Sequence, residues 1–245
     1  METGASRRQS QSEEGKTAVI TWRHLARFLM FALLLPALLF ATAGTLHWAM
    51  GWAYTLITLA AVIGSRLIVM RRNPELLKER ARALEHADAK KWDRVIVPIV
   101  GMYGPLAMLV VSGLDRRFGW TPAMSLGLQL TGLFLVMVGS ALGTGAMVAN
   151  RFFSAVVRIQ KERGHAVVSS GPYSFVRHPG YAGGVLGNLA IPLALGSIWA
   201  LIPGALTALV TVVRTILEDR TLQAELDGYS EYAQRVRYRL LPGIW

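Results

Sequence analysis

Long apolar runs recur along this chain and are separated by shorter polar connections. They cover about residues 25–46, 48–70, 95–114, 122–149, 181–196 and 198–217. A helix needs about 20 mostly apolar residues to cross the roughly 30 Å hydrocarbon core of a bilayer, and backbone groups in hydrocarbon must be satisfied within the segment. The pattern therefore predicts an all-α, polytopic membrane protein with six spanning helices, or five if the last two runs form a partial hairpin.

Lys and Arg residues are concentrated in alternate connections. Residues 1–27 hold five of them, the connector 71–94 holds eight, residues 151–177 hold five and residues 214–245 hold five, whereas the turn around His47 holds none. Connections on the cytosolic side of membrane proteins carry the excess of Lys and Arg. The pattern predicts that both termini and both long basic connections lie in the cytosol.

The composition agrees with a membrane environment and narrows the function. Apolar residues make up 53% and charged residues 17% of the 245 residues, against roughly 25% charged residues in soluble domains. The formal net charge of +11 is accounted for by the topology, so no nucleic-acid partner is required. Because the chain has no cysteine, disulfide scaffolds, thiolate zinc clusters and cysteine nucleophiles are excluded, and no metal site is expected.

Three regions follow from this pattern. Residues 1–22 are expected to form a disordered cytosolic lead-in. Residues 23–120 are expected to form a first transmembrane region, which includes the cytosolic connector 71–94. Residues 121–245 contain the last spans. The first apolar run also resembles a cleaved signal peptide. However, the polar stretch before it is long and Pro36 interrupts it, so we interpret it as a retained span.

Two further features allow a structural and a functional interpretation. In the connector, Asn73 and Pro74 predict the start of a surface helix, which is either solvated or in contact with anionic lipid.

Glycines recur at four-residue spacing, as Gly139 and Gly143, Gly180 and Gly184, and Gly183 and Gly187. Such spacing favours close helix packing in a bilayer, with contact to a ligand as the alternative.

Polar residues gather in two segments that flank the last hairpin, at residues 171–184 and 214–242. Pro179 prevents a helix from continuing through the residue before it, and a helix that begins there offers its N-terminus to a carboxylate. In the other segment, Glu218 and Leu222 share a helix face, where a carboxylate can receive an ammonium group or a ribose hydroxyl. Together they predict a cytosolic pocket for a zwitterionic ligand with an adenosyl group.

Each of these residues also has a purely structural interpretation. His178 could bond a carbonyl at the membrane interface, and Glu218 could pair with Arg214, one turn before it on a helix. The tyrosines of the last segment could form an aromatic belt. The joint occurrence of these residues on one side of the membrane favours a site over such separate roles.

The two segments resemble the motifs of the isoprenylcysteine carboxyl methyltransferase and phospholipid methyltransferase superfamily of integral membrane enzymes. The first family motif, Arg-His-Pro-x-Tyr-x-Gly, is matched by Arg177, His178, Pro179, Tyr181 and Gly183. The second, Glu-Glu-x-x-Leu, is matched at Glu218 and Leu222, while Asp219 replaces the usual second glutamate. The resemblance covers about residues 120–245 and reaches the first two spans only through hydropathy.

The resemblance implies a methyltransferase-like catalytic region over residues 121–245. This region would take S-adenosylmethionine from the cytosol and a hydrophobic or lipid-like acceptor from the bilayer, among membrane lipids. Its cofactor-binding residues would be His178, Pro179, Tyr181, Gly183, Glu218 and Leu222. No contact is carried over to Asp219, whose side chain is shorter than that of the family glutamate.

The acceptor group is open to more than one interpretation. A carboxylate is already ionised at neutral pH and needs only a cation to hold it, for which Arg235 and Arg239 are the candidate catalytic residues. The chain favours a carboxylate, because Tyr232–Trp245 contains three arginines and no acidic residue. The alternatives are a phospholipid N-methyltransferase, which requires a base, a sterol-type NADPH reductase of related fold, and a scaffold or transporter. A transporter would place more ionisable groups near the midplane.

Overall fold

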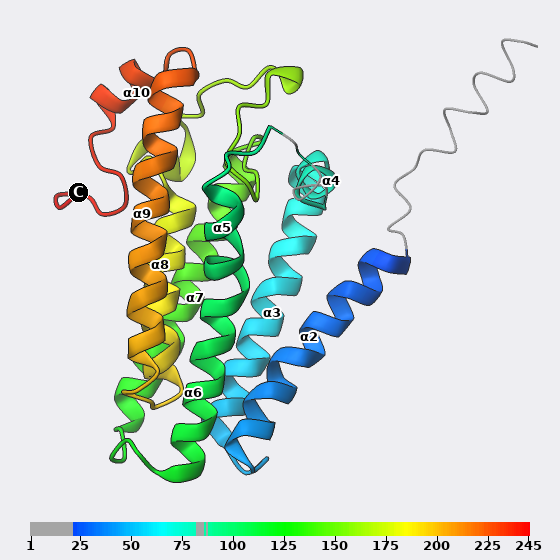
Figure 1. Cartoon of the computed structure of the whole chain (residues 1–245), viewed down its shortest axis with the longest axis vertical. Coiled ribbons are helices and arrows are strands. Elements are labelled where there is room, and N and C mark those ends of the chain that lie inside the picture. The colour runs from blue at the N-terminus through cyan, green and yellow to red at the C-terminus, as the bar shows by residue number, and fades with distance from the viewer. Residues whose placement is uncertain (1–21, 82–85, 87) are drawn as a thin grey trace, which may run out of the picture. The chain divides into compact units, whose positions relative to one another are not determined.

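The helices of the computed structural model follow the apolar runs of the sequence. The structure describes residues 22–81, 86 and 88–245 (Figure 1). Its helices are α2 (Trp22–Ala43), α3 (Ala49–Arg72), α4 (Pro74–Ala81), α5 (Asp93–Pro98), η2 (Ile99–Tyr103), α6 (Gly104–Phe118), α7 (Leu126–Ala149), η3 (Lys161–Arg163), η4 (Gly171–Ser174), α8 (Pro179–Ala194), α9 (Leu201–Glu225) and α10 (Tyr229–Arg235). The described residues contain no β-strand, which confirms the all-α prediction. Apart from Trp22, the predicted lead-in lies outside the described residues.

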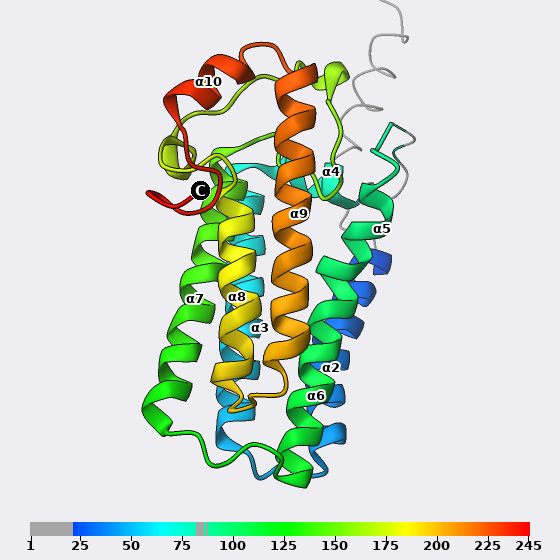
Figure 2. The ribbon, with the colours of Figure 1, turned by 60° about the vertical axis from the view of Figure 1, so that its left-hand side comes forward.

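Within the described residues, four helical stretches are long and apolar enough to cross a membrane, namely α3, the continuous stretch Asp93–Phe118, α7 and α9. α8 has 16 residues, which makes it shorter than the hydrocarbon core at about 1.5 Å per residue. It forms the predicted hairpin with α9 (Figure 2). A shorter apolar helix, Ala32–Ala43, lies within α2. The structure therefore confirms a multi-pass arrangement.

The described residues up to Ala37 and those from Leu38 onward belong to two separate compact units, and the boundary falls within α2. Within the second unit, α8 lies between α7 and α9 (Figure 2). α9 also contacts η2 and α6. The residues of both sequence motifs belong to this second unit.

Two glycines allow α7 and α8 to approach each other closely. A Cβ atom at Gly183 would lie 2.4 Å from the carbonyl oxygen of Gly139, and a Cβ atom at Gly139 would lie 2.6 Å from the carbonyl oxygen of Gly183. The packing interpretation is therefore confirmed for these two residues. A Cβ atom at Gly143, Gly184 or Gly187 would meet open space, so close packing does not require glycine there.

The last spanning helix is longer than its apolar run. The run ends near residue 217, but α9 continues to Glu225. Residues 218–225 contain neither Gly nor Pro, so no helix-breaking residue interrupts this stretch, and Gly228, which has a φ of 78°, follows soon after the helix ends. The second motif therefore lies on the end of a spanning helix.

The connector begins as the Asn73-Pro74 pair predicts. Pro74 is the first residue of α4, and the backbone N–H of Leu76 donates to the carbonyl of Asn73 at 3.2 Å. The side-chain amide of Asn73 donates to the carbonyl of Met147 at 3.4 Å, which ties the start of α4 to the end of α7. Residues 82–85 and 87 of the connector lie outside the described residues.

A buried carboxylate ties the connections together at the end of the bundle opposite α10. Asp115 of α6 accepts hydrogen bonds from the hydroxyl of Ser197 at 2.5 Å and from the backbone N–H of Thr121 at 2.7 Å. The hydroxyl of Thr121 in turn accepts one from the backbone N–H of Ile198 at 3.0 Å. The α6–α7 connection and the α8–α9 turn are thus fixed to each other, away from the two motifs.

Candidate functional site

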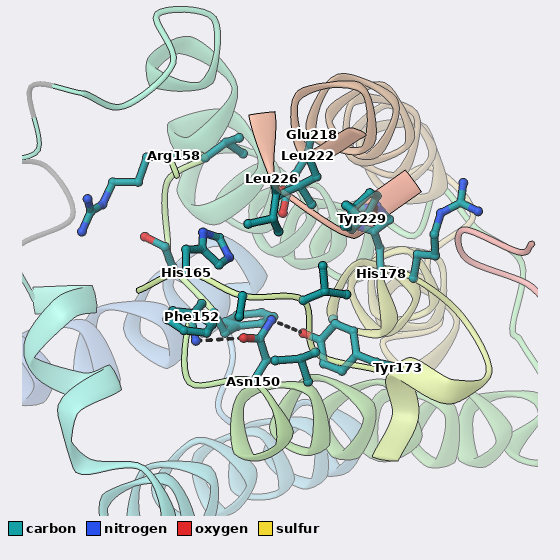
Figure 3. A pocket seen from close by; sticks show the side chains of 18 of the residues that line it. Asn150, Phe152, Arg158, His165, Tyr173, His178, Glu218, Leu222, Leu226 and Tyr229 are labelled. Carbon is teal, nitrogen blue, oxygen red and sulfur yellow. Dashed lines mark hydrogen bonds between the residues drawn. The ribbon is translucent and has the colours of Figure 1, made fainter. Parts of the chain in front are cut away.

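A cavity lies where α8 begins and α9 ends (Figure 3). It is lined by the segment 150–168, the first turn of α8, the last turns of α9, and α10. Its empty space is about 770 Å³, which includes space open to solvent. Small-molecule sites in proteins are lined mainly by apolar and aromatic side chains with a few placed polar groups. The residues that line this cavity are of both kinds.

Four of the six residues predicted to bind the cofactor line this cavity, namely His178, Tyr181, Glu218 and Leu222. Pro179 is the first residue of α8 and places His178 just before the helix and Tyr181 in its first turn. The two rings stack with centroids 5.7 Å apart. The Tyr181 hydroxyl donates a short hydrogen bond to the Glu218 carboxylate, so the two motifs meet at the cavity wall.

The other predicted residues lie outside the cavity lining. Pro179 is buried at the helix start, and Gly183 faces the α7 backbone. Arg235 is exposed in the last turn of α10. Arg239 donates a hydrogen bond from Nε to Asp219 at 2.9 Å. Direct contact of these four residues with a ligand stays a prediction.

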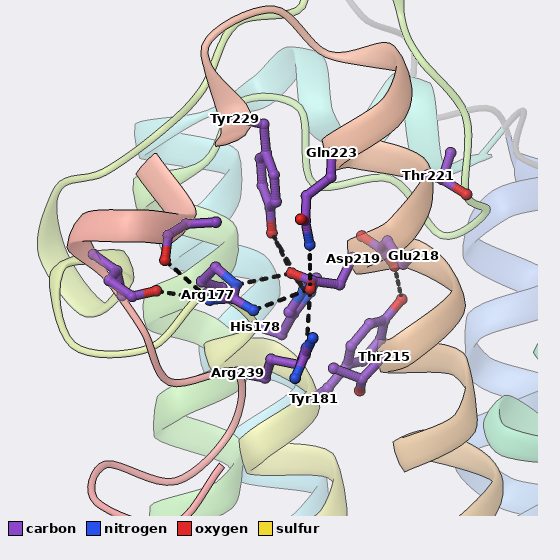
Figure 4. A network of polar contacts seen from close by, with 12 residues as sticks. Arg177, His178, Tyr181, Thr215, Glu218, Asp219, Thr221, Gln223, Tyr229 and Arg239 are labelled. Atoms are coloured by element: carbon purple, nitrogen blue, oxygen red, sulfur yellow. Dashed lines mark hydrogen bonds and ion pairs between the residues drawn. The ribbon is translucent and has the colours of Figure 1, made fainter. Parts of the chain in front are cut away.

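Asp219 joins both motifs to the C-terminal segment (Figure 4). Its side chain is fully buried and accepts two parallel hydrogen bonds from Arg177, at 2.8 and 3.0 Å. The remaining donors are His178 Nε2 (3.2 Å), the Tyr229 hydroxyl (2.9 Å), the Gln223 amide (2.8 Å) and Arg239 Nε (2.9 Å). Hydrogen bonds to an ionised acceptor are roughly twice as strong as neutral ones. The sequence had given Asp219 no role, although an acid in one motif and an arginine in the other were a signal for pairing.

Arg177 also holds the segment that follows α10. Its Nη1 donates to the carbonyls of Val236 and Arg237, both at 2.9 Å. The backbone N–H groups of Arg177 and His178 donate to the carbonyls of Tyr238 and Arg239, again at 2.9 Å. The C-terminal segment is therefore docked on the start of α8, next to the cavity.

Two tyrosines of α10 stay protonated at neutral pH and act as hydrogen-bond donors. Burial and the charge of Asp219 raise the pKa of the Tyr229 hydroxyl. Burial also raises the pKa of Tyr232 to about 12, and its hydroxyl donates to the carbonyl of Tyr173 at 2.7 Å. Both residues line the cavity, so α10 forms a wall with fixed polar groups.

The segment 150–168 forms another wall, which is attached to the connector by Arg158. The Arg158 side chain is almost fully buried and donates hydrogen bonds to Glu79 (2.8 Å), Asp88 (3.0 Å) and Glu162 (2.6 Å). Burial opposes the charge of the guanidinium, but these three carboxylates raise its pKa. The sequence reasoning missed this cluster, because Glu79 and Asp88 lie 79 and 70 residues away from Arg158 along the chain.

His165 is a neutral imidazole in the same wall. Its ring lies 4.6 Å from the ring of Phe152, centroid to centroid, and its Nδ1 accepts a hydrogen bond from the backbone N–H of Gln160 at 3.3 Å. Burial and the charges of Arg158 and Arg163 lower the pKa of His165 to about 4. It therefore presents an uncharged aromatic surface to the cavity at physiological pH.

A buried ion pair between α5 and α9 also holds the segment 150–168 in place. Arg214 donates to Asp93 at 2.7 and 3.0 Å and to the carbonyl of Ala155 at 2.8 Å. Asp93 also accepts a hydrogen bond from the backbone N–H of Val157 at 2.7 Å. Arg214 thus pairs with Asp93 and not with Glu218, which leaves the Glu218 carboxylate to Tyr181 and the cavity.

Comparison with known proteins matches this chain to a protein family, to relatives and to a solved structure. Residues 123–226 match the family described as phospholipid methyltransferase. A protein-S-isoprenylcysteine O-methyltransferase of Homo sapiens is 32% identical over 117 residues, 44% of this chain and 39% of the relative. Protein-S-isoprenylcysteine O-methyltransferase B of Arabidopsis thaliana is 29% identical over 108 residues, 43% of this chain and 55% of the relative. A solved eukaryotic intramembrane Ras methyltransferase, isoprenylcysteine carboxyl methyltransferase, has a TM-score of 0.46 and 16% identity over 92% of this chain and 88% of its own.

These matches confirm the resemblance to the isoprenylcysteine carboxyl methyltransferase and phospholipid methyltransferase superfamily. The family match extends from the start of α7 to the end of α9 and contains the residues of both motifs. The matched segment spans about two fifths of the human relative and about half of the Arabidopsis relative. α3 to α6 and the C-terminal segment lie outside the family match.

Proposed function

We propose that this protein is an integral membrane methyltransferase that uses S-adenosylmethionine and acts on a lipid-like acceptor, with a carboxylate as the favoured acceptor group. The observation that carries the proposal is the meeting of the two motifs, through Tyr181 and Glu218, at a cavity on the end of apolar helices. The relatives named as protein-S-isoprenylcysteine O-methyltransferases support both the reaction and the carboxylate. Because the matched family and relatives are methyltransferases, methyl transfer is favoured over an NADPH-dependent reduction.

The residues of the cavity fit a ligand with an adenosyl group and a zwitterionic end. Among the described residues, the only hydrogen bond recorded for the Glu218 carboxylate comes from Tyr181, so its remaining lone pairs can receive an ammonium group or ribose hydroxyls. The rings of Phe152, Tyr181 and His165 line the cavity and offer flat faces for a base. We propose that His178, Tyr181, Glu218 and Leu222 bind the cofactor.

The proposed chemistry needs little from the protein beyond positioning. When bound, S-adenosylmethionine supplies a methyl group whose transfer forms an oxygen–carbon bond to the acceptor, while the sulfur–carbon bond breaks and leaves its electron pair on sulfur. A carboxylate acceptor has no proton to lose, so the chain needs no general base. The walls formed by segment 150–168 and α10 limit access of water and hold the reactants together, which is the main source of rate here.

The catalytic roles of Arg235 and Arg239 remain proposals, and the structure supports them to different degrees. Arg239 binds Asp219, through which it positions His178, whereas Arg235 is exposed on α10. If Arg239 acts on the acceptor, Arg239→Ala lowers turnover far more than it lowers affinity for S-adenosylmethionine. Equal loss of both would identify Arg239 as a residue that supports the cofactor site.

A phospholipid amine is the second candidate acceptor, because the matched family is described as phospholipid methyltransferase. An ammonium group must lose its proton before it can attack, which requires a base. His178 lines the cavity and its Nε2 contacts Asp219 at 3.2 Å, so it is the residue we would assign to that role.

We also propose that the cavity and both termini face the cytosol. The basic connector 71–94 and the segment 150–168 lie at the same end of the helices as the cavity (Figure 1), as the distribution of Lys and Arg predicts. The exposed Lys161 should then react with a membrane-impermeant amine reagent in opened vesicles and not in intact cells. Labelling in intact cells would reverse the orientation.

The proposed function is tested first by cofactor binding. The full chain, purified in detergent, is titrated with S-adenosylmethionine and with NADPH in a calorimeter. We expect saturable binding of S-adenosylmethionine and none of NADPH. Binding of NADPH alone would overturn the methyltransferase proposal in favour of the reductase.

A further inference from the structure

Arg80 of α4 lies directly behind a ring of the cavity wall. Its guanidinium carbon is 5.4 Å from the centroid of the Phe153 ring, and Phe153 lines the cavity. The ring is seated against α8 where Gly180 leaves room, since a Cβ atom at Gly180 would lie 2.7 Å from it. An arginine over an aromatic face is attracted to it, so this contact holds the cation against the wall of the cavity.

A second guanidinium lies behind the neighbouring ring. The guanidinium carbon of Arg214 is 5.1 Å from the centroid of the Tyr181 ring, and Tyr181 also lines the cavity. The charge of Arg214 is balanced by Asp93 through hydrogen bonds of 2.7 and 3.0 Å. Two cations therefore approach the same part of the wall, and one of them has a carboxylate partner.

Arg80 differs from Arg214 in that none of the described carboxylates pairs with it. Glu79, its neighbour in α4, instead accepts a hydrogen bond from Arg158 at 2.8 Å. Within the part of the chain that the structure describes, no carboxylate forms an ion pair with Arg80. A partly buried cation that lacks a paired carboxylate is costly.

The surroundings of Arg80 favour the arrival of an anion. Burial and the positive charges of Arg214 and Arg66 lower the pKa of its guanidinium, but an arginine remains protonated at physiological pH. Arg80 therefore stays positively charged although burial and the neighbouring arginines disfavour its charge. An anion bound here would relieve that repulsion and would receive strong, charge-assisted hydrogen bonds.

We propose that Arg80 binds the carboxylate of the methyl acceptor and holds it at the wall formed by Phe153 and Tyr181, beside Glu218. This inference rests on the proposed function, because it presupposes a carboxylate acceptor. Arg80 lies outside residues 123–226, which match the family. The specificity for the acceptor would then come from the N-terminal region, and the cofactor site from the family region.

The position of Arg80 suits a head group that is carried by an apolar tail. α4 follows directly on α3, a candidate span that ends at Arg72, so Arg80 lies near the membrane surface. The planar guanidinium can bind both oxygens of a carboxylate. None of Arg80, Arg235 and Arg239 lines the cavity. Arg80 lies against the ring of Phe153, which does line it, whereas Arg235 is exposed and Arg239 is bound to Asp219.

The test compares Arg80→Gln and Arg80→Lys with Arg71→Gln, which removes one charge from the exposed end of α3. Each full-length variant is assayed in detergent with radiolabelled S-adenosylmethionine and an S-farnesylated cysteine carboxylic acid. We expect Arg80→Gln to raise KM for the acid about tenfold, equivalent to about 1.4 kcal/mol, and Arg80→Lys to raise it less. The Kd for S-adenosylmethionine should stay at the wild-type value, which also shows that each variant is folded.

An unchanged KM in Arg80→Gln, with an active wild type, overturns the inference and leaves the proposed function intact. If the wild type makes no ester, the proposed function fails. Direct binding of the farnesylated acid and of its carboxamide then decides the role of Arg80. Loss of the preference for the acid in Arg80→Gln supports that role, and an unchanged preference overturns it.

A lipid phosphate is the competing source of an anion at Arg80. The same variants are therefore assayed in nanodiscs of phosphatidylcholine alone and of phosphatidylcholine with phosphatidylglycerol. A raised KM in both kinds of nanodisc supports binding of the acceptor. A defect that is seen only with phosphatidylglycerol assigns the site to lipid and overturns the inference.

Discussion

Arg177 and Asp219 form two parallel hydrogen bonds, of 2.8 and 3.0 Å, that join the start of α8 to the end of α9. The side chains are 5% and 0% exposed, respectively, so neither charge has water as a substitute partner. Removal of one member of a buried pair leaves an uncompensated charge and typically costs about 3–5 kcal/mol. We therefore expect the contact between α8 and α9 at the cavity to depend on this pair.

Asp219→Asn should destabilise the protein by about 3–5 kcal/mol, because the amide cannot accept the hydrogen bonds of Arg177, Arg239 and Tyr229 as an anion. We expect a lower midpoint of thermal unfolding in detergent and weaker binding of S-adenosylmethionine. Asp227→Asn, at an exposed position after α9, is the matched control. Equal midpoints for the two variants would show that the network contributes little to stability.

His178→Ala and Glu218→Ala should each weaken binding of S-adenosylmethionine about tenfold or more, which corresponds to about 1.4 kcal/mol. The two residues come from different helices but line one cavity, so each loss removes part of the same binding surface. Glu231→Ala, on the exposed face of α10, is the control for loss of a carboxylate. Wild-type affinity in both site variants would refute the site assignment.

Hydropathy predicted the helices well, because the hydrocarbon of a membrane requires each spanning segment to be apolar and helical. The six apolar runs correspond to α2, α3, the α5–α6 stretch, α7, α8 and α9. The sequence placed the end of the last helix too early, since hydropathy falls at residue 217 while helix-forming residues continue to Glu225. The motifs also indicated which ends of α8 and α9 face the cavity.

The contacts that complete the site could not be predicted from local pattern. Arg214 and Asp93 are 121 residues apart in the chain, and nothing in the spacing favours that pair over the nearby Glu218. Arg235 and Arg239 were equivalent in the sequence, yet the first is exposed and the second binds Asp219. The difference arises because the chain leaves α10 and folds back onto α8.

Gly183→Ala should destabilise the α7–α8 contact, because the added Cβ atom would lie 2.4 Å from the carbonyl oxygen of Gly139. Overpacking of this kind costs about 1–3 kcal/mol, so the thermal midpoint should fall. Gly184→Ala meets open space and should leave the midpoint unchanged or raise it, since alanine favours helix. Similar effects of both substitutions would contradict the close approach.

The stability of the protein should depend on the charge state of His165. Its pKa is lowered in the folded protein from the ordinary 6.5 to about 4, so the unfolded chain takes up this proton first as the pH falls. The contribution of His165 is therefore complete above about pH 6.5 and is lost progressively towards about pH 4.

We expect the thermal midpoint of the wild type to fall more steeply between these pH values than that of His165→Gln, which cannot be protonated. The comparison of two proteins cancels the titration of carboxylates that both share. Parallel midpoint curves would mean that His165 has the same pKa in the folded and unfolded states.

The last prediction concerns the product of methyl transfer. The guanidinium of Arg80 lies against the ring of Phe153, which lines the cavity. Positive charge there attracts an anionic acceptor and repels a protonated amine. We therefore expect the product to be a methyl ester on an apolar acid. The measurement is transfer of a radiolabelled methyl group to lipid extract or to an S-farnesylated cysteine carboxylic acid, followed by mild alkaline hydrolysis.

An ester releases its label as volatile methanol under these conditions, whereas an N-methylated phospholipid retains it. Glu218→Ala, assayed in parallel, shows whether the label depends on the proposed site. Volatile label from the wild type alone supports the carboxylate, because only an ester formed in this cavity behaves in that way. Label that is stable to base would refute the carboxylate and favour the phospholipid amine, with His178 as the base to be tested next.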